Sequence, residues 1–338
     1  DSFSKNMIKI KFENLLVSIV VSVVVFFNTI STTMLDRTFF QVKLNFLFLV
    51  ILLLGLRFLY KMRVSYKYLI LSILLLLSGV LVYFQTHRLN FLVYSMLLVL
   101  LVNVDMKVVL RNYVIVAGIL VVGVFLLSLV GMVPNLQYNR AGVIRNSFGF
   151  IYPTDFASHC FYLFLAISYL LKDKFIWTRS LFGVLLSAFI IKYCDARLNA
   201  LSILLATVIF IYFYYSNGKK LKIFALLPYS AVVFASVVTY LSYKFSWSNP
   251  FLVSINKLIT GRLALGRNAF DTFGVHLFGT RNVQFIGSGG KTESVIGYNY
   301  VDSSYVQMLF TYGIVPVVLL IIIYVVASRK QYKDGQYL

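Results

Sequence analysis

The chain has 338 residues, of which 60% are hydrophobic and only 12% are charged. A soluble globular domain has about 45–50% apolar and about 25% charged residues, so this composition excludes a water-soluble fold and, equally, a disordered chain. The net charge of +20 comes from short Lys and Arg clusters between apolar runs, which argues against a nucleic-acid partner because no basic reading face is apparent. We therefore expect an all-α polytopic integral membrane protein.

Ten apolar stretches are long enough to cross a membrane, which takes about 20 predominantly apolar residues. They are residues 13–34, 39–60, 66–85, 89–105, 111–133, 155–171, 177–194, 198–216, 221–243 and 303–327. The first is longer than a signal-peptide core and lacks a clear cleavage pattern, so we expect a retained helix. Two longer segments, 134–154 and 244–302, remain as loops of a single membrane domain spanning 1–338.

The distribution of basic residues predicts the orientation of these helices, because short cytoplasmic loops hold the excess of Lys and Arg. With the N-terminus inside, 18 Lys and Arg fall in inner segments and seven in the four short outer ones. The long segment 244–302 holds the other six. We predict cytoplasmic N- and C-termini, with both loops on the extracytoplasmic side of a bacterial plasma membrane.

Arginine is concentrated on the predicted outer side. Only 5 of the 18 inner basic residues are Arg, against 8 of the 13 outer ones. Orientation makes no demand for Arg over Lys, whereas the planar guanidinium grips phosphate or carboxylate with two parallel hydrogen bonds. The skew favours an anionic ligand at the outer leaflet, with chance and lipid-headgroup contacts as the alternative.

The first polar motif is YNRAGVIRNSFGFIYPTD, residues 138–155. Arg140 and Arg145 precede Gly149 and Pro153, which break the chain before the next span. A loop of this kind can fold back and present both guanidinium groups to one phosphate-bearing ligand. A solvated loop with headgroup contacts is the alternative.

The second motif is CDARLN, residues 194–199, at the start of a predicted span. Asp195 suits the positive end of the helix dipole and could simply cap the helix. Arg197 does not suit that dipole, and its position makes sense if an anion lies between it and the helix end.

The third motif, GRLALGRN (261–268), carries Arg262 and Arg267. A spacing of five leaves them about 140° apart on a helix, so we expect one on the ligand and one in a structural ion pair. The loop ends in YNYVDSSY (298–305), whose polar and aromatic side chains suit the binding of sugars.

The remaining chemistry-bearing residues form no recognisable site. Three His and two Cys have no metal-ligand spacing, and there is no nucleotide-binding loop, GxSxG or CxxC motif. We expect neither metal nor cofactor, so the energy for any reaction has to reside in the substrate.

Together these motifs resemble the Wzy-type oligosaccharide repeat-unit polymerases of capsule and exopolysaccharide synthesis, and more distantly the O-antigen ligases. The similar segments are RNSFGFIYPTDFA (145–157), DARLNAL (195–201), GRLALGRNAFDTFGVHLFG (261–279) and VDSSYVQMLFTYGIV (301–315). Thr154 stands where these families usually have Asn. An acid at Asp302, where ligases often have His, favours a polymerase.

The resemblance implies a GT-C-like fold and undecaprenyl-pyrophosphate-linked glycans as substrates. It also implies membrane lipids as partners and a polysaccharide chain-length regulator as a further candidate partner. Arginines would stabilise the departing pyrophosphate, and a carboxylate would act as general base. The residues are Arg140, Arg145, Arg197, Arg262 and Arg267 for pyrophosphate, Asp195 or Asp302 as the base, and Tyr138, Tyr298, Tyr300 and Tyr305 for the glycan.

Two other functions remain open at this point. An O-antigen-ligase-like transferase would use the same residues on a different acceptor. A lipid-linked-sugar flippase or transporter would need charged residues at mid-membrane depth, and Lys43 is the only one inside a predicted span.

Overall fold

The computed structural model describes residues 2–35, 50–51, 54–55, 65–102, 104–140, 142–172, 174–216, 222–288, 291 and 296–333. Most of them are helical. The elements are α1 (Ser2–Ser31), α3 (Tyr66–Thr86), α4 (Asn90–Leu100), α5 (Met106–Leu129), β1 (Gln137–Arg140), β2 (Val143–Asn146), α6 (Pro153–Leu171), α7 (Ile176–Cys194), α8 (Arg197–Tyr215), the 3₁₀ helix η2 (Lys222–Tyr229), α9 (Ser230–Lys244), α10 (Pro250–Leu258), α11 (Arg262–Phe273), α12 (Ser304–Thr311) and α13 (Ile314–Lys333).

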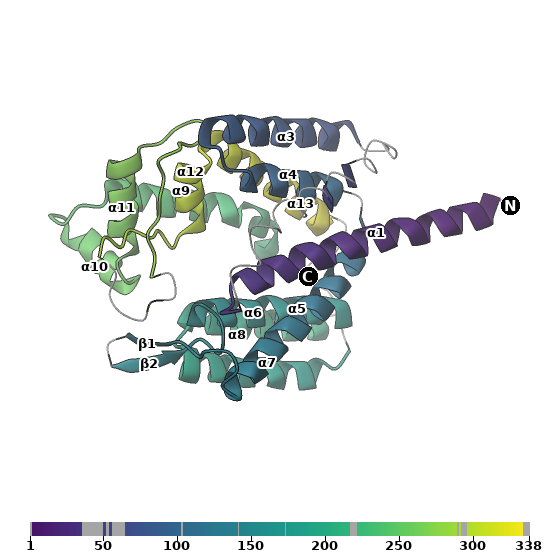
Figure 1. The fold of residues 1–338 in the computed structure, drawn as a ribbon, viewed down its shortest axis with the longest axis horizontal. Helices are drawn as coiled ribbons and strands as arrows, with labels where there is room; N and C mark the ends of the chain where they lie inside the picture. Colours follow the sequence, from purple (N-terminus) through teal and green to yellow (C-terminus); the bar gives the residue numbers. More distant parts are fainter. Residues whose placement is uncertain are drawn as a thin grey trace. The chain divides into compact units, whose positions relative to one another are not determined.

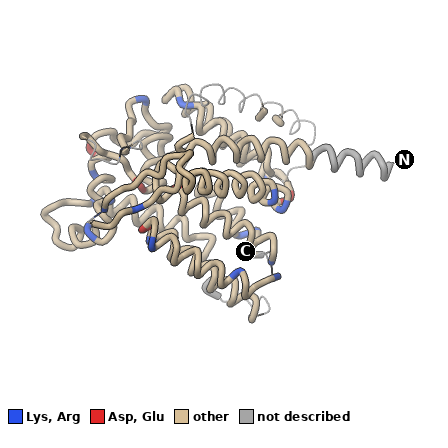
Figure 2. Tube along the Cα trace, turned by 60° about the horizontal axis from the view of Figure 1, so that its bottom comes forward, with Lys and Arg blue, Asp and Glu red and all other residues tan. Residues whose placement is uncertain are grey.

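Within this described part, eight helices are long and apolar enough to cross a membrane: α1, α3, α5, α6, α7, α8, α9 with the end of η2, and α13. Figure 2 shows Lys and Arg mainly near helix ends and in connecting segments, with uncharged stretches along the helices between them. Charges are expensive inside a bilayer, so this distribution is the one expected of spanning helices. The prediction of a helical, multi-pass membrane protein is confirmed at this level.

Three of the ten predicted spans differ in the structure or fall outside it. The stretch 89–105 forms only the 11-residue helix α4, whose length of about 16 Å is too short to cross a bilayer. The stretch 303–327 is two helices, α12 and α13, because the chain breaks at Gly313. The stretch 39–60 lies almost entirely outside the described residues, so the count of ten stays a prediction.

Gly313 explains the break in the last predicted span. Its φ is +94°, and an added Cβ would collide with the backbone of Leu277 and Gly279. The amides of Ile314 and Val315 donate to the carbonyls of His276 and Leu277 at 3.0 and 3.1 Å. The segment with His276 and Leu277 therefore accepts hydrogen bonds from amides that every helix leaves free in its first turn. As a result, α13 begins there as a separate helix.

The chain forms two compact units. The first unit contains α1, α5, the β1–β2 hairpin, α6, α7 and α8; the second contains α3, α4, η2 and α9 to α13. The core of the first unit joins α5, α6, α7 and α8 around side chains such as Phe156, Ile190 and Ile203. In the second unit, α11 and α12 pack through Ala269, Val306 and Phe310.

The segments that follow α1 and precede α6 meet at one end of the first unit. Thr33 forms a β-bridge with Phe150, and Met34 N donates to Gly149 O at 2.9 Å. The predicted alternation of the helices requires these ends to lie on the same side of the membrane, and their contact fits it. Which side this is stays a prediction.

The two predicted loops are structured. Within 134–154, β1 and β2 form a two-stranded antiparallel sheet beside the ends of the helices of the first unit, as Figure 1 shows, so the all-α prediction missed this hairpin. Within 244–302, the chain forms the short helices α10 and α11.

Candidate functional site

The hairpin carries the first two predicted arginines. Tyr138 lies opposite Arg145 in the register, and Arg140 lies opposite Val143. The turn is held by Asn139, whose Oδ1 accepts a hydrogen bond from the amide of Gly142 at 3.0 Å. Short-range hydrogen bonds from an Asn side chain to a backbone amide favour turns, and this turn places Arg140 and Arg145 on neighbouring strands.

Asn135 and an aromatic cluster fix the base of the hairpin. The Asn135 Oδ1 accepts hydrogen bonds from the amides of Ser147 and Phe148, at 3.1 and 2.8 Å. Phe148 then packs against Phe125, Phe156 and Phe189, with ring centroids 5.2–5.4 Å apart. The hairpin is thereby held against α5, α6 and α7.

Strand β2 also caps the end of α7. Arg145 Nε donates to the carbonyl of Cys194 at 2.9 Å, and Asn146 Nδ2 donates to that of Tyr193 at 3.3 Å. These are among the last four carbonyls of α7, which have no partner within the helix. Arg145, predicted only as a pyrophosphate ligand, thus has a structural contact that the sequence did not predict.

Asp195 occupies the sharp corner between α7 and α8. It is the C-cap of α7 in the left-handed conformation, with φ +46°, and Asp tolerates this region better than most residues. Ala196, not Asp195, is the N-cap of α8, and no side chain caps that helix. The hypothesis that Asp195 caps the N-terminus of α8 is therefore wrong, and its role as a general base stays a prediction.

Asp195 lies between two arginines. Its Oδ1 accepts a hydrogen bond from Arg197 Nε at 2.8 Å, and its Oδ2 lies 3.9 Å from Arg140 Nη1. The residue is 7% exposed, and among the described residues its Oδ2 has no hydrogen-bond donor. We name Arg140, Arg145, Asp195 and Arg197 the arginine cluster.

The arginine cluster has three cations and one anion. Burial, followed by the neighbouring Arg140, lowers the pKa of Arg145, while Asp195 acts in the opposite direction. Arginine nonetheless stays protonated at any physiological pH. The cluster therefore keeps a net charge of about +2, and a multivalent anion would complement it.

The second unit holds the other predicted pair of arginines. Arg262 is the first residue of α11, and its Nε donates to Asp302 Oδ2 at 3.1 Å. Asn256 accepts from the amides of Leu263 and Ala264 at 3.0 and 3.1 Å, so it takes the place of an N-cap residue. Both Arg197 and Arg262 thus begin a helix and contact an aspartate through Nε.

Arg267 is held by a separate set of contacts. Its Nη2 lies 2.8 Å from Asp271, one helical turn away, and its Nη1 donates to the carbonyl of Tyr243 at 2.6 Å. We expect one of Arg262 and Arg267 to contact a ligand and the other to form a structural ion pair. In the structure, both have an aspartate partner. Arg262 and Arg267 are each 36–39% exposed in the side chain, so both remain accessible.

The four predicted glycan-binding tyrosines are divided between the two units. Tyr138 belongs to the first unit, and its hydroxyl donates to the carbonyl of Ile151 at 2.6 Å. In the second unit, the ring of Tyr300 lies 6.3 Å from that of Phe285, Tyr298 is exposed, and Tyr305 lines an apolar groove. Their role in glycan binding stays a prediction.

Sequence reasoning missed the residues that position the site. The hairpin had a readable signal, since Asn139 and Gly142 lie between two short segments with extended propensity. Asn135 and Asn256 act on amides more than five residues away, which no local pattern shows. Among the described residues, no three His, Cys, Asp or Glu side chains lie together as a metal site would require.

Comparisons of the chain with models of protein families, with curated proteins and with solved structures found no match.

Proposed function

We propose that the protein is a membrane glycosyltransferase that polymerises undecaprenyl-pyrophosphate-linked oligosaccharide repeat units into capsular polysaccharide or exopolysaccharide. The reaction would take place at the outer face of the plasma membrane. The observation that carries this proposal is the arginine cluster, in which Arg140 and Arg197 contact one buried carboxylate and Arg145 holds the end of α7 beside it.

A pyrophosphate ester is the kind of anion that this cluster fits. It carries two or more negative charges, and its phosphoryl oxygens match the forked geometry of guanidinium groups. A lipid-linked pyrophosphate also lies at the level where spanning helices end. A soluble phosphate ligand would not require a binding site at the end of a membrane-spanning helix.

The charges of the cluster suit the chemistry of glycosyl transfer. The bond between the anomeric carbon and the pyrophosphate oxygen breaks, and the lipid pyrophosphate leaves with the electron pair. A hydroxyl oxygen of the acceptor sugar bonds to the anomeric carbon, and its proton passes to a carboxylate. Arginines fixed in place stabilise the charge that builds on the leaving group, so no nucleotide is needed.

Asp195 is the stronger of the two candidates for the carboxylate that takes the proton. Its Oδ2 is buried and has no hydrogen-bond donor among the described residues, so an acceptor hydroxyl could supply one. Asp302 is 41% exposed in its side chain, and Arg262 contacts its Oδ2. We assign Asp302 and Arg262 to substrate binding in the second unit.

The test is an in vitro reaction. Purified protein in detergent is incubated with its lipid-pyrophosphate-linked repeat unit in the presence of EDTA, and the glycans are separated on a gel. We expect a ladder spaced by one repeat unit, because arginines rather than a divalent ion neutralise the pyrophosphate.

Three other outcomes would contradict either this function or the role given to the arginines. Transfer of a single glycan to a different acceptor without a ladder would indicate a ligase. Movement of the lipid across a vesicle membrane without chain growth would indicate a flippase. A ladder that disappears on addition of EDTA would overturn the role given to the arginines.

A further inference from the structure

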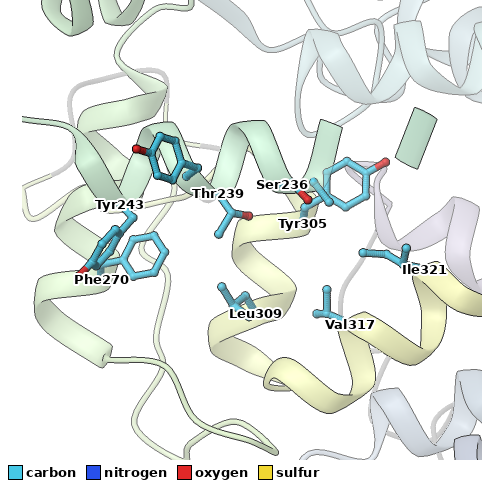
Figure 3. Close-up of a pocket in the computed structure, with 10 residues that line it drawn as sticks. Ser236, Thr239, Tyr243, Phe270, Tyr305, Leu309, Val317 and Ile321 are labelled. Carbon is cyan, nitrogen blue, oxygen red and sulfur yellow. The ribbon is translucent and has the colours of Figure 1, made fainter. Parts of the chain in front are cut away.

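An apolar groove runs along the second unit between α9, α12 and α13. It has a volume of about 390 Å³, and Phe270 of α11 also lines it. Figure 3 shows Ser236 and Thr239 of α9 on one side, with Leu309 of α12 and Val317 and Ile321 of α13 on the other. Because α13, and α9 together with the end of η2, are long enough to span a membrane, we place the groove at the depth of lipid chains.

A polar pocket of about 630 Å³ adjoins this groove. Lys244, Arg267, Asn268 and Asp271 contribute its polar lining, and Tyr243 lines both spaces. Tyr243 also organises the basic groups, since Arg267 lies 5.7 Å and Lys244 lies 5.6 Å from the centre of its ring. Two cations against one carboxylate leave the pocket with a net charge of about +1.

The order of residues along α9 gives these two spaces their depth in a membrane. Lys244 is the last residue of α9, and Trp247, which is 72% exposed, follows it. Lys and Trp at the end of an apolar helix mark the interface between hydrocarbon and headgroups. The polar pocket is therefore at headgroup level, and the groove extends from it about 12 Å along α9, from Tyr243 to Ala235.

We propose that this pair of spaces binds a phosphate-bearing membrane lipid, with its chain in the apolar groove and its phosphate at Arg267 and Lys244. A basic pocket at headgroup level, which shares Tyr243 with an apolar groove at chain level, matches a lipid with an anionic head. A soluble phosphate would leave the groove unused, and an uncharged lipid would leave the cations without a counter-charge.

The inference rests on the proposed function for its assignment of Arg267 to a phosphate, but its test measures binding without glycosyl transfer. Native mass spectrometry in detergent would compare two probes that differ only in the head, undecaprenyl phosphate and undecaprenol. We expect undecaprenyl phosphate to bind at least tenfold more tightly than undecaprenol, since one charge-assisted hydrogen bond increases affinity by about that factor.

Two variants separate the chain site from the head site. Ser236→Trp fills the groove and should weaken both probes roughly tenfold or more, because several buried methylene groups lose their contacts. Val237→Trp on the same helix does not line the groove and is its matched control. Arg267→Gln should weaken only undecaprenyl phosphate, with the exposed Lys257→Gln of α10 as control.

The outcomes are separable from those of the polymerisation assay. The assignment of the lipid chain to the groove would be overturned if Ser236→Trp and Val237→Trp bound the probes equally well and both unfolded at the same temperature as the parent protein. Loss of binding in Arg197→Gln but not in Arg267→Gln would place the lipid in the first unit instead. Competition by inorganic phosphate without any effect of Ser236→Trp would show a site for a free anion. Lipid binding without a glycan ladder would contradict the proposed polymerase activity but not the lipid site.

Discussion

At the scale of single residues, Asp195 has the most unusual surroundings in the described part of the chain. It is buried, adopts a left-handed backbone conformation and lies between Arg140 and Arg197. A carboxylate there relieves the repulsion between neighbouring guanidinium groups, while its buried Oδ2 has no hydrogen-bond donor among the described residues. Arg179 is also buried, but its Nη1 contacts the backbone. It donates to the carbonyls of Ser168 and Lys172 at the end of α6.

Replacing each acid by its amide tests which one takes the proton. Asp195→Asn should slow ladder formation by about 10²–10⁴-fold, the usual contribution of a general base. Asp302→Asn should mainly weaken the binding of the repeat unit. Initial rates at several substrate concentrations measure both effects, and a reversed order of the two variants would identify Asp302 as the base.

Arg197 offers a clean test of the arginine cluster because its side chain is 77% exposed. Its removal should leave the fold intact. Arg197→Ala should reduce polymerisation roughly 10²–10³-fold, as the loss of one transition-state donor does. Arg197→Lys should restore only part of this, since Lys lacks the planar fork. Arg329→Ala, at the predicted inner end of α13, is the control; normal ladders from Arg197→Lys and Arg197→Ala would refute the pyrophosphate role.

At the scale of elements, the hairpin and the α7–α8 corner depend on each other. Strand β2 supplies donors to the last carbonyls of α7, and the corner supplies Asp195 to Arg140 of β1. The hairpin in turn reaches α5 through Gly149, whose φ is +84°. A Cβ at this glycine would lie 2.7 Å from Val124 Cγ1 of α5.

Two glycines of the same loop separate backbone strain from packing. Gly142→Ala, at φ +85° in open space, should destabilise by about 1–2 kcal/mol from the left-handed backbone alone. Gly149→Ala has the same strain and about 1–3 kcal/mol more from overpacking against α5. Thermal unfolding in detergent should show the larger drop for Gly149→Ala, and equal drops would mean that the hairpin does not pack on α5.

At the scale of the whole molecule, the two units repeat one arrangement. In each, an arginine at the first position of a helix contacts an aspartate, as Arg197 contacts Asp195 and Arg262 contacts Asp302. Both pairs lie in segments that the charge distribution predicts to be extracytoplasmic. The proposed reaction requires this orientation, because we propose that it takes place at the outer face of the plasma membrane.

Cysteine labelling in intact cells tests the orientation. Gly142→Cys, in the exposed turn of the hairpin, should react with a membrane-impermeant maleimide, and Lys330→Cys, near the end of α13, should react only after lysis. The parent protein is the control, since Cys194 is buried and Cys160 lies within a candidate span. The reverse pattern would place both arginine pairs in the cytoplasm and contradict the proposed function.

Much of the fold could be predicted from the sequence because hydropathy is a local property. Each of the eight long apolar helices corresponds to one predicted span, although η2 replaces the first two turns of the stretch 221–243 and Gly313 shortens the last. The arginines and acids of the site were also identifiable, because Arg in place of Lys and acids at span ends are visible in any window of the chain.

The tertiary structure alone decided which of these residues meet. Arg140 and Asp195 are 55 positions apart, and Arg262 and Asp302 are 40 apart. Ion pairs of this separation depend on where the chain returns, which the periodicity of one segment does not contain. The same holds for the break at Gly313, set by the backbone of Leu277 and Gly279, and for the groove between α9, α12 and α13. Composition and charge by themselves determined a membrane protein with arginines near the ends of its spans. Packing of the tertiary structure decided which carboxylate lies beside those arginines.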